Sequence, residues 1–266
     1  MAYPTVLYGP DSEVFNTYSK VSPAPSAAIA GGPIKFRHRH ALGKQLVLED
    51  GRKFRFAASG SGTLVVGNVL SAGVATASQQ SLAPQTAVVV GDRSLIITTG
   101  AASAINVFAE GYLIPTITTA NVTGHCYRIA GHALMTSGTD TVHLAPGNAA
   151  LEALSTGTSK IDLIDNPYFR VVQLPATTAA SMIVGVAVSG PTTLLACWIQ
   201  TRGVAAVLGI TATIAGTRAV APSSTAGAVG PETASAGTSD IESDIGRSMH
   251  AHAATQGQPT FLTLDG

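Results

Sequence analysis

Short runs of apolar, β-branched residues follow one another along most of the chain, each bounded by Gly, Pro, Asn, Ser or Thr. Strands favour β-branched and aromatic side chains, whereas Gly and Pro interrupt them. The pattern predicts strands at residues 63–66, 86–90, 94–98, 105–108, 112–117, 161–164, 169–174, 208–214 and 260–264. Turns recur about every 8–12 residues, the spacing of β-sandwiches and β-barrels. We therefore expect an all-β fold of short-stranded sandwich or barrel modules, with at most one or two short helices.

One segment has a helical pattern. Residues 148–154 (NAALEAL) combine strong helix formers, follow a Pro-Gly-Asn turn and end before Gly157. Such start and stop signals predict a helix of about two turns.

Three segments share a common pattern, in which an apolar stretch around a glycine is followed by a Gly-containing turn and a second strand-like run. They are residues 127–144, 181–199 and 244–264. A glycine inside a strand indicates a bulge or the close approach of another backbone. Three related hairpins fit the duplication of a small β unit. Chance similarity among Ala-, Gly- and Val-rich segments is an equally good explanation.

The first 34 residues differ from the rest of the chain. They contain Pro4, Pro10, Pro23, Pro25 and Pro33. Proline at this density prevents a helix or a central strand. The same segment carries Tyr3, Tyr8, Phe15 and Tyr18. We expect residues 1–34 to form an extended N-terminal arm that becomes ordered against a partner. The alternative is a frayed terminus that happens to contain aromatic residues.

A basic cluster follows this arm. It consists of Lys35, Arg37, Arg39, Lys44, Arg52, Lys53 and Arg55, together with His38 and His40. Seven Lys or Arg against Glu49 and Asp50 give residues 35–55 a net charge of +5, so the remainder carries −5. Asp50-Gly51 between the apolar runs 46–48 and 54–56 predicts a β-hairpin. We favour docking of this basic hairpin onto an acidic protein surface over nucleic-acid binding, because few aromatic residues are interleaved with the charges.

The composition indicates a folded protein with a mostly neutral surface. Charged residues make up 11% of the 266-residue chain, against about 25% in typical soluble domains. A hydrophobic content of 45% excludes general disorder. The apolar runs are too short for a membrane span, and the start shows no secretion signal. A surface so short of charge is suited to being covered by neighbouring subunits. Alternatively, Thr and Ser hydroxyl groups keep it soluble.

Residues able to support chemistry are scattered. Cys126 and Cys197 form no CxxC motif and lie in apolar strand-like runs, so we expect both to be buried, reduced and inert. His125 and Cys126 are adjacent, and successive strand residues point to opposite faces. There is no GxSxG motif and no phosphate-binding loop.

Histidine pairs are the remaining candidates for a metal site. His38 with His40 and His250 with His252 have the spacing that places two imidazoles on one strand face, and His132 and His143 could lie on facing strands. None of these pairs has an obvious third ligand. We expect no catalytic residue, no cofactor and no metal, and therefore a protein that is not an enzyme.

The C-terminal third carries a family resemblance. An apolar strand at residues 196–203 is followed by a turn containing Ala215-Gly216, a Ser/Thr/Ala/Gly loop at 222–229, an Ile245-Gly246 strand and a closing strand at 260–264. This succession resembles the small β-barrel module of phage head decoration (capsid cement) proteins. Residues 42–70, ending in Gly67-Asn68-Val69-Leu70, are similar to the opening of phage virion proteins.

The resemblance implies a structural protein of a virion. A decoration protein binds over the junctions of the major capsid protein, is often a homotrimer, stabilises the head shell from its outer surface and assembles in the bacterial cytoplasm. On this view residues 35–195 form a β-rich domain with the basic hairpin, and residues 196–266 a small β-barrel-like decoration module. The alternative is another virion component, such as a head fibre base, a tail protein or an adhesion protein. A polysaccharide-degrading enzyme is a third hypothesis.

The expected contacts of such a protein lie in its arm and its basic hairpin. The residues that we expect to bind the capsid or another partner are Tyr3, Tyr8, Phe15, Tyr18, Lys35, Arg37, Arg39, Arg52, Lys53 and Arg55. The partners are the major capsid protein and further copies of this chain, and we expect neither a membrane nor nucleic acid among them.

Overall fold

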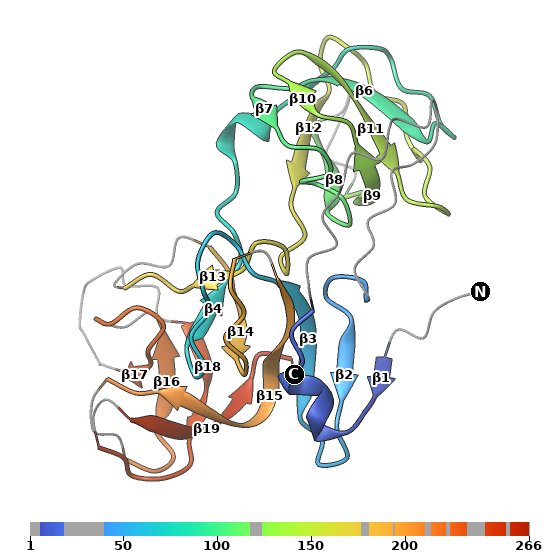
Figure 1. The fold of residues 1–266 in the computed structure, drawn as a ribbon. Helices are drawn as coiled ribbons and strands as arrows, with labels where there is room; N and C mark the ends of the chain where they lie inside the picture. The colour runs from blue at the N-terminus through green and yellow to red at the C-terminus, as the bar shows by residue number, and fades with distance from the viewer. Residues whose placement is uncertain are drawn as a thin grey trace. The chain divides into compact units, whose positions relative to one another are not determined.

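The protein is all-β and divides into two compact units (Figure 1). The computed structural model describes residues 6–18, 40–117, 124–176, 181–193, 195–210, 214–221, 224–232, 243–253 and 256–265. Unit 1 comprises the described residues up to 74 and those from 167 onward, and unit 2 comprises the described residues between 75 and 166. Helical structure in these ranges is limited to two 3-10 helices, η1 (Asp11–Phe15) and η2 (Ala77–Gln79). No described segment is a helix long and apolar enough to cross a membrane.

Unit 1 is built on one sheet, in which eleven strands pair among the described residues. They are β1 (Val6–Tyr8), β2 (Gln45–Val47), β3 (Lys53–Ala58), β4 (Val69–Ser71), β13 (Val172–Gln173), β14 (Ile183–Ala187), β15 (Ala196–Leu208), β16 (Arg218–Ala221), β17 (Gly230–Pro231), β18 (Ser243–Ser248) and β19 (Gly257–Thr263). The main path runs β1-β2-β3-β15-β19-β18-β16-β17, while β14 joins β4 to β15 and β4 pairs with β13. The long strand β15 pairs with β3 along its first half and with β19 along its second half, so it connects the early and late parts of the chain.

The side chains of β3 and β15 meet in a common core. Trp198 of β15 is the register partner of Phe56 of β3, and both side chains are fully buried. Their rings lie 5.1 Å apart in an edge-to-face arrangement, and the ring of His40 lies 5.4 Å from that of Trp198. Figure 1 shows β3 and β15 side by side although they are far apart in the sequence.

Unit 2 contains a six-stranded sheet and a two-stranded sheet among its described residues. The larger sheet has the order β12 (Lys160–Ile164), β8 (Tyr112–Ile117), β9 (Tyr127–His132), β11 (Thr139–Leu144), β6 (Ser94–Thr98) and β5 (Ala83–Pro84), and the smaller one pairs β7 (Ala102–Ser103) with β10 (Met135–Thr136). The core of unit 2 is apolar and includes Leu95, Ile97, Phe108, Leu113 and Ile129.

Several local predictions are confirmed. The hairpin predicted around Asp50-Gly51 is formed by β2 and β3, and Gly51 adopts a φ of 82° that favours glycine. The three glycine-centred segments each form an antiparallel pair, β9 with β11, β14 with β15 and β18 with β19. At Gly246 an added Cβ atom would lie 2.0 Å from the carbonyl oxygen of Phe261, so the predicted close backbone approach is present. That the three pairs arose by duplication stays a prediction.

The predicted helix at residues 148–154 is wrong. Leu154 instead forms an antiparallel bridge with Val88, and the Ala150 amide donates a hydrogen bond to the carbonyl oxygen of Asp92. These backbone groups are therefore bound to a neighbouring extended segment, and the buried side chains of Ala150 and Leu154 join the core of unit 2.

Some predicted strands are also absent from the described residues. Residues 63–66 and 105–108 form loops and turns, and residues 86–90 contribute a single bridge at Val88. Leu64 and Phe108 are nevertheless buried, because an apolar run can anchor a loop to the core as well as form a strand.

The described part of the N-terminal segment packs against unit 1 and is no free arm. β1 pairs with β2 in parallel, the amide of Tyr18 donates to the carbonyl oxygen of Ala196, and Val14 is buried in the core that surrounds Trp198. These contacts bury the apolar side of residues 6–18 on the chain's own body. Residues 1–5 and 19–39 lie outside the described residues.

The division into units differs from the one expected from the sequence. Boundaries were expected at residues 34/35 and 195/196, whereas the contacts separate the chain near residues 74/75 and 166/167. The reason is the pairing of β15 with β3, because it places residues 196–266 in the same sheet as the hairpin β2–β3.

Candidate protein interaction surface

The predicted contact residues separate into three groups. Tyr3, Lys35, Arg37 and Arg39 lie outside the described residues. Tyr8 of β1 and Phe15 of η1 are 82% and 62% exposed, so they are available to a partner. Tyr18 is partly buried, its hydroxyl donates to the carboxylate of Glu13, and its ring lies 5.6 Å from that of Phe56. Tyr18 therefore supports the fold.

Arg52 connects the hairpin turn to helix η1. Its guanidinium nitrogen atoms lie 2.5 Å from Oδ2 of Asp50 and 3.0 Å from Oδ1 of Asp11. The hydrogen bond from the Arg52 amide is the main reason why the pKa of Asp50 lies below its usual value. Because two carboxylates flank this cation, Arg52 contributes no excess positive charge to the hairpin.

Arg55 is bound within the fold. Its guanidinium donates two hydrogen bonds to the carboxylate of Asp265, at 2.7 and 2.9 Å, and a third to the carbonyl oxygen of Gly43. Burial by itself raises the pKa of Asp265, but the hydrogen bonds from Arg55 and Thr201 lower it below the usual value. Lys53 lies on β3 near Arg55 and is half-buried. The hydroxyl group of Thr201 donates a hydrogen bond to the carbonyl oxygen of Lys53.

Replacement of Asp265 by asparagine is expected to lower the free energy of unfolding of unit 1 by about 1–3 kcal/mol, since a partly buried guanidinium loses its counter-charge. Urea denaturation followed by circular dichroism measures the loss. The matched control is Asp50→Asn, which removes one carboxylate from an exposed ion pair and should cost less than about 1 kcal/mol. Equal losses in the two variants would contradict the structural role of the Arg55–Asp265 pair.

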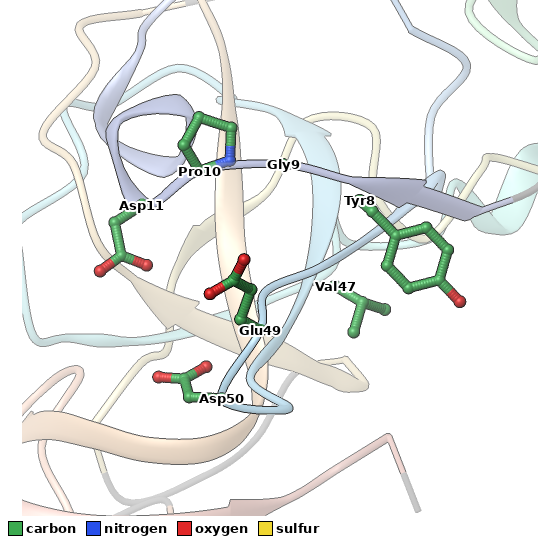
Figure 2. A pocket seen from close by; sticks show the side chains of 7 residues that line it. All are labelled: Tyr8, Gly9, Pro10, Asp11, Val47, Glu49 and Asp50. Atoms are coloured by element: carbon green, nitrogen blue, oxygen red, sulfur yellow. The ribbon is translucent and has the colours of Figure 1, made fainter.

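A hollow with an acidic wall lies beside the hairpin turn. It measures about 700 Å³ and is lined by Tyr8, Gly9, Pro10, Asp11, Val47, Glu49 and Asp50. Figure 2 shows the carboxylates of Asp11, Glu49 and Asp50 gathered on one side and the ring of Tyr8 beyond Val47 on the other. We call this feature the acidic hollow.

A second hollow lies on the other side of the same turn. It measures about 360 Å³ and is lined by Asp50, Gly51, Arg52, Arg202, Gly203, Val204 and Phe261. Asp50 lines both hollows, so the two adjoin each other at the hairpin turn of unit 1.

The second hollow opens onto an uncovered face of the sheet. Val204, Phe261 and Arg247 are register partners across β15, β19 and β18, and all three side chains are exposed. We define the open face by Arg202, Val204, Ala206, Arg247, Pro259 and Phe261. The alternate residues of these strands, such as Val207, Ile245 and Leu262, are buried in the core. The uncovered side of such a sheet is normally polar, whereas this one carries apolar side chains between arginines.

The open face was not predicted from the sequence. Its signal is the alternation Arg202, Val204, Ala206 in β15, with buried residues between them. Alternation identifies the exposed side of one strand, but the pairing of β15 with β19 is needed to bring Val204 beside Phe261.

Within the part of the chain that the structure describes, the residues considered for chemistry do not come together in one place. Within the described ranges no group of three or more His, Cys, Asp or Glu side chains could hold a metal ion. His132 and His143 lie on paired strands, but their register partners are Val142 and Gly131, which places the two rings on opposite faces. His38 lies outside the described residues.

The two cysteines differ in environment. Cys197 is buried, as predicted, and burial raises the pKa of its thiol to about 12, which keeps it in the unreactive thiol form. The predicted burial of Cys126 is wrong, because this residue precedes β9 and is exposed.

The buried ring of His132 should make the stability of unit 2 depend on pH. Its Nε2 atom accepts a hydrogen bond from the Phe108 amide at 3.1 Å, and its Nδ1 atom lies 2.7 Å from the carbonyl oxygen of Ala133, so the neutral ring fits the site. Burial lowers the pKa of His132 below its usual value of 6.5. The unfolded chain then binds a proton at higher pH than the folded chain. The free energy of unfolding should therefore fall as the pH drops below about 6.5 toward the lower folded pKa.

Denaturation of the wild type at about pH 7.5 and about pH 5.5 brackets this window. His132→Gln should weaken the pH dependence of unit 2. His143→Gln removes a half-buried histidine of β11 that lies on the opposite face of the sheet from His132. This variant should retain the pH dependence. An unchanged pH dependence in His132→Gln would show that another group is responsible.

Comparisons with known proteins add no relative from which a role could be transferred. No family model, no curated protein and no solved structure matches this chain. Any functional inference must therefore come from the residues themselves.

Proposed function

We propose that this chain is a viral structural protein, a capsid decoration (cement) protein that binds over junctions of the major capsid protein and stabilises the head from outside. Its role is to contact other subunits and not to catalyse a reaction. The sequence resemblance of residues 42–70 and 196–266 suggests the family, and the all-β fold is compatible with it. The proposal places the protein on the virion surface after assembly in the bacterial cytoplasm.

One structural observation carries the proposal. In unit 2, the turn that contains Val89 and Val90 is bonded to the segment around Leu151, because the Gly91 amide donates to the carbonyl oxygen of Ala150. Val90 and Leu151 are 64% and 65% exposed. We call Val89, Val90 and Leu151 the apolar ridge. Exposed apolar side chains on neighbouring segments of a surface favour a protein contact, and the chain has only 11% charged residues.

The copy number in purified particles tests the function. A decoration protein should be present in hundreds of copies, in a fixed ratio to the major capsid protein, when gel bands are quantified by densitometry. Tens of copies or fewer would instead favour the alternative of a tail, head fibre base or adhesion protein. Absence from particles would contradict both.

The apolar ridge can be tested with shells that lack the protein. Co-sedimentation should show that Val90→Glu combined with Leu151→Glu weakens binding to the shells at least tenfold, or by about 1.4 kcal/mol. Val65→Glu is the matched control, because Val65 is an exposed valine of unit 1 outside the ridge. Equal binding of ridge variant and wild type would remove the ridge from the contact.

A further inference from the structure

We infer that the open face of unit 1 is the contact for a second copy of this chain, and that the acidic hollow of that copy receives it. The inference rests on the proposed function, since it assigns a surface to the self-association that a shell-bound subunit is expected to have. It adds the residues that meet and the charges that select the partner.

The open face carries positive charge that forms no ion pair within the described part of the chain. The guanidinium of Arg202 donates to the carbonyl oxygen of Asp265, and that of Arg247 to the carbonyl oxygen of Gly216. Both acceptors are neutral carbonyl groups, and neither arginine forms an ion pair with a described residue. Two cations therefore flank the exposed apolar side chains of Val204 and Phe261, which are 48% and 42% exposed.

The acidic hollow carries the complementary charge. Asp11, Glu49 and Asp50 contribute three carboxylates, and among the described residues one cation, Arg52, is paired with them. Two negative charges remain, equal in number to the two free arginines of the open face. Tyr8 supplies an exposed aromatic ring that can pack against the apolar part of the open face.

The positions of the open face and the acidic hollow also suit contact between identical chains. They lie on either side of one hairpin turn and share Asp50. Two neighbouring surfaces of opposite charge make the molecule self-complementary, because each copy can offer its open face and its acidic hollow at once. Two copies that exchange both surfaces form a two-fold pair, whereas three copies that each bind a different neighbour through each surface form a ring, and the mass of the assembly distinguishes them.

Single-stranded nucleic acid is the other class of ligand that arginine and phenylalanine on a sheet can bind. The structure favours protein over nucleic acid for two reasons. The carboxylates beside the open face repel phosphate groups, and the face offers one aromatic ring among aliphatic side chains in place of a row of stacking rings.

Analytical ultracentrifugation of the full chain with exchanged charges tests the inference. In low salt the wild type should have a multiple of its 26.9 kDa mass, and added salt should weaken the association. Arg202→Glu/Arg247→Glu and Asp11→Lys/Glu49→Lys should each be monomeric. An equimolar mixture of the two variants should associate again, because each reversed surface now faces its opposite. Arg247→Glu alone should weaken the association. Its matched control is Arg93→Glu, which reverses an exposed arginine of unit 2 and should keep the wild-type mass.

Several outcomes would overturn the inference. They are a monomeric wild type in low salt, a wild-type mass for either reversed variant, no association in the mixture, or loss of association in Arg93→Glu. Binding of a single-stranded oligonucleotide that is abolished by Arg202→Glu/Arg247→Glu would also overturn it. Circular dichroism verifies folding. If Arg202→Glu/Arg247→Glu does not fold, Arg202→Ser/Arg247→Ser replaces it and should weaken self-association at least tenfold. A monomer that still co-sediments with shells would refute the self-contact and leave the decoration function standing.

Discussion

Replacement of Trp198 by alanine is expected to lower the free energy of unfolding of unit 1 by about 3–5 kcal/mol. Trp198 is the largest fully buried side chain among the described residues, and it packs against Phe56 and His40 in the half of β15 that pairs with β3. Its removal leaves a cavity that the surrounding sheet cannot close without losing strand pairing. The loss is large relative to the total stability of a typical domain.

Circular dichroism during urea denaturation measures this effect, because the chain contains no second tryptophan for fluorescence. Trp198→Phe should cost less than Trp198→Ala, since it leaves a smaller cavity, and it remains informative if the alanine variant does not fold. Val65→Ala is the matched control at an exposed position of unit 1 and should change stability by less than about 0.5 kcal/mol. Similar losses for Trp198→Ala and Val65→Ala would contradict the role of this core.

Gly246→Ala should destabilise unit 1 by about 2–5 kcal/mol, the combined cost of overpacking and of a backbone conformation unfavourable for a side chain. The φ angle at Gly246 is 153°, and an added Cβ atom would meet the carbonyl oxygen of Phe261 at 2.0 Å. That atom belongs to the backbone of β19, so β18 and β19 must separate to admit a methyl group.

Hydrogen exchange resolves where this damage occurs. The amides of β18 and β19 should lose protection in Gly246→Ala, while the amides of unit 2 should keep theirs. Gly62→Ala is the control, because no atom lies within 4 Å of a Cβ atom placed at Gly62. It should cause no loss, and a gain of up to about 1 kcal/mol is expected from the reduced entropy of the unfolded chain. Wild-type protection of β18 and β19 in Gly246→Ala would contradict the close approach.

The local parts of this fold could be predicted from sequence, because turn chemistry and alternation act over a few residues. Asp50-Gly51 predicted the β2–β3 hairpin, and the glycines of three apolar stretches predicted antiparallel pairs that the structure contains. The helix at residues 148–154 failed because the strong local preference of its residues was outweighed by hydrogen bonds to the segment around Val88.

The candidate surface was less predictable, because strand pairing brings together residues that are distant in the sequence. The basic hairpin was identified correctly as an element, but two of its arginines, Arg52 and Arg55, are paired within the fold. Arg55 binds Asp265, which is far away in the chain, and Arg52 binds Asp11 and Asp50. Arg202 and Arg247 form no ion pair with a described residue, and only the register of β15, β19 and β18 places them on one face.

The pairing of β3 with β15 has a consequence during synthesis. The described part of unit 2 comes from one stretch of chain, so it can fold as soon as that stretch has left the ribosome. Phe54 and Phe56, by contrast, must wait for a strand that is translated on the order of 10 s later, at the usual rate of about 5–20 residues per second. The nascent chain therefore carries a finished second unit while the aromatic residues of the first are still without their cover, and this interval is when chaperones would have most to protect.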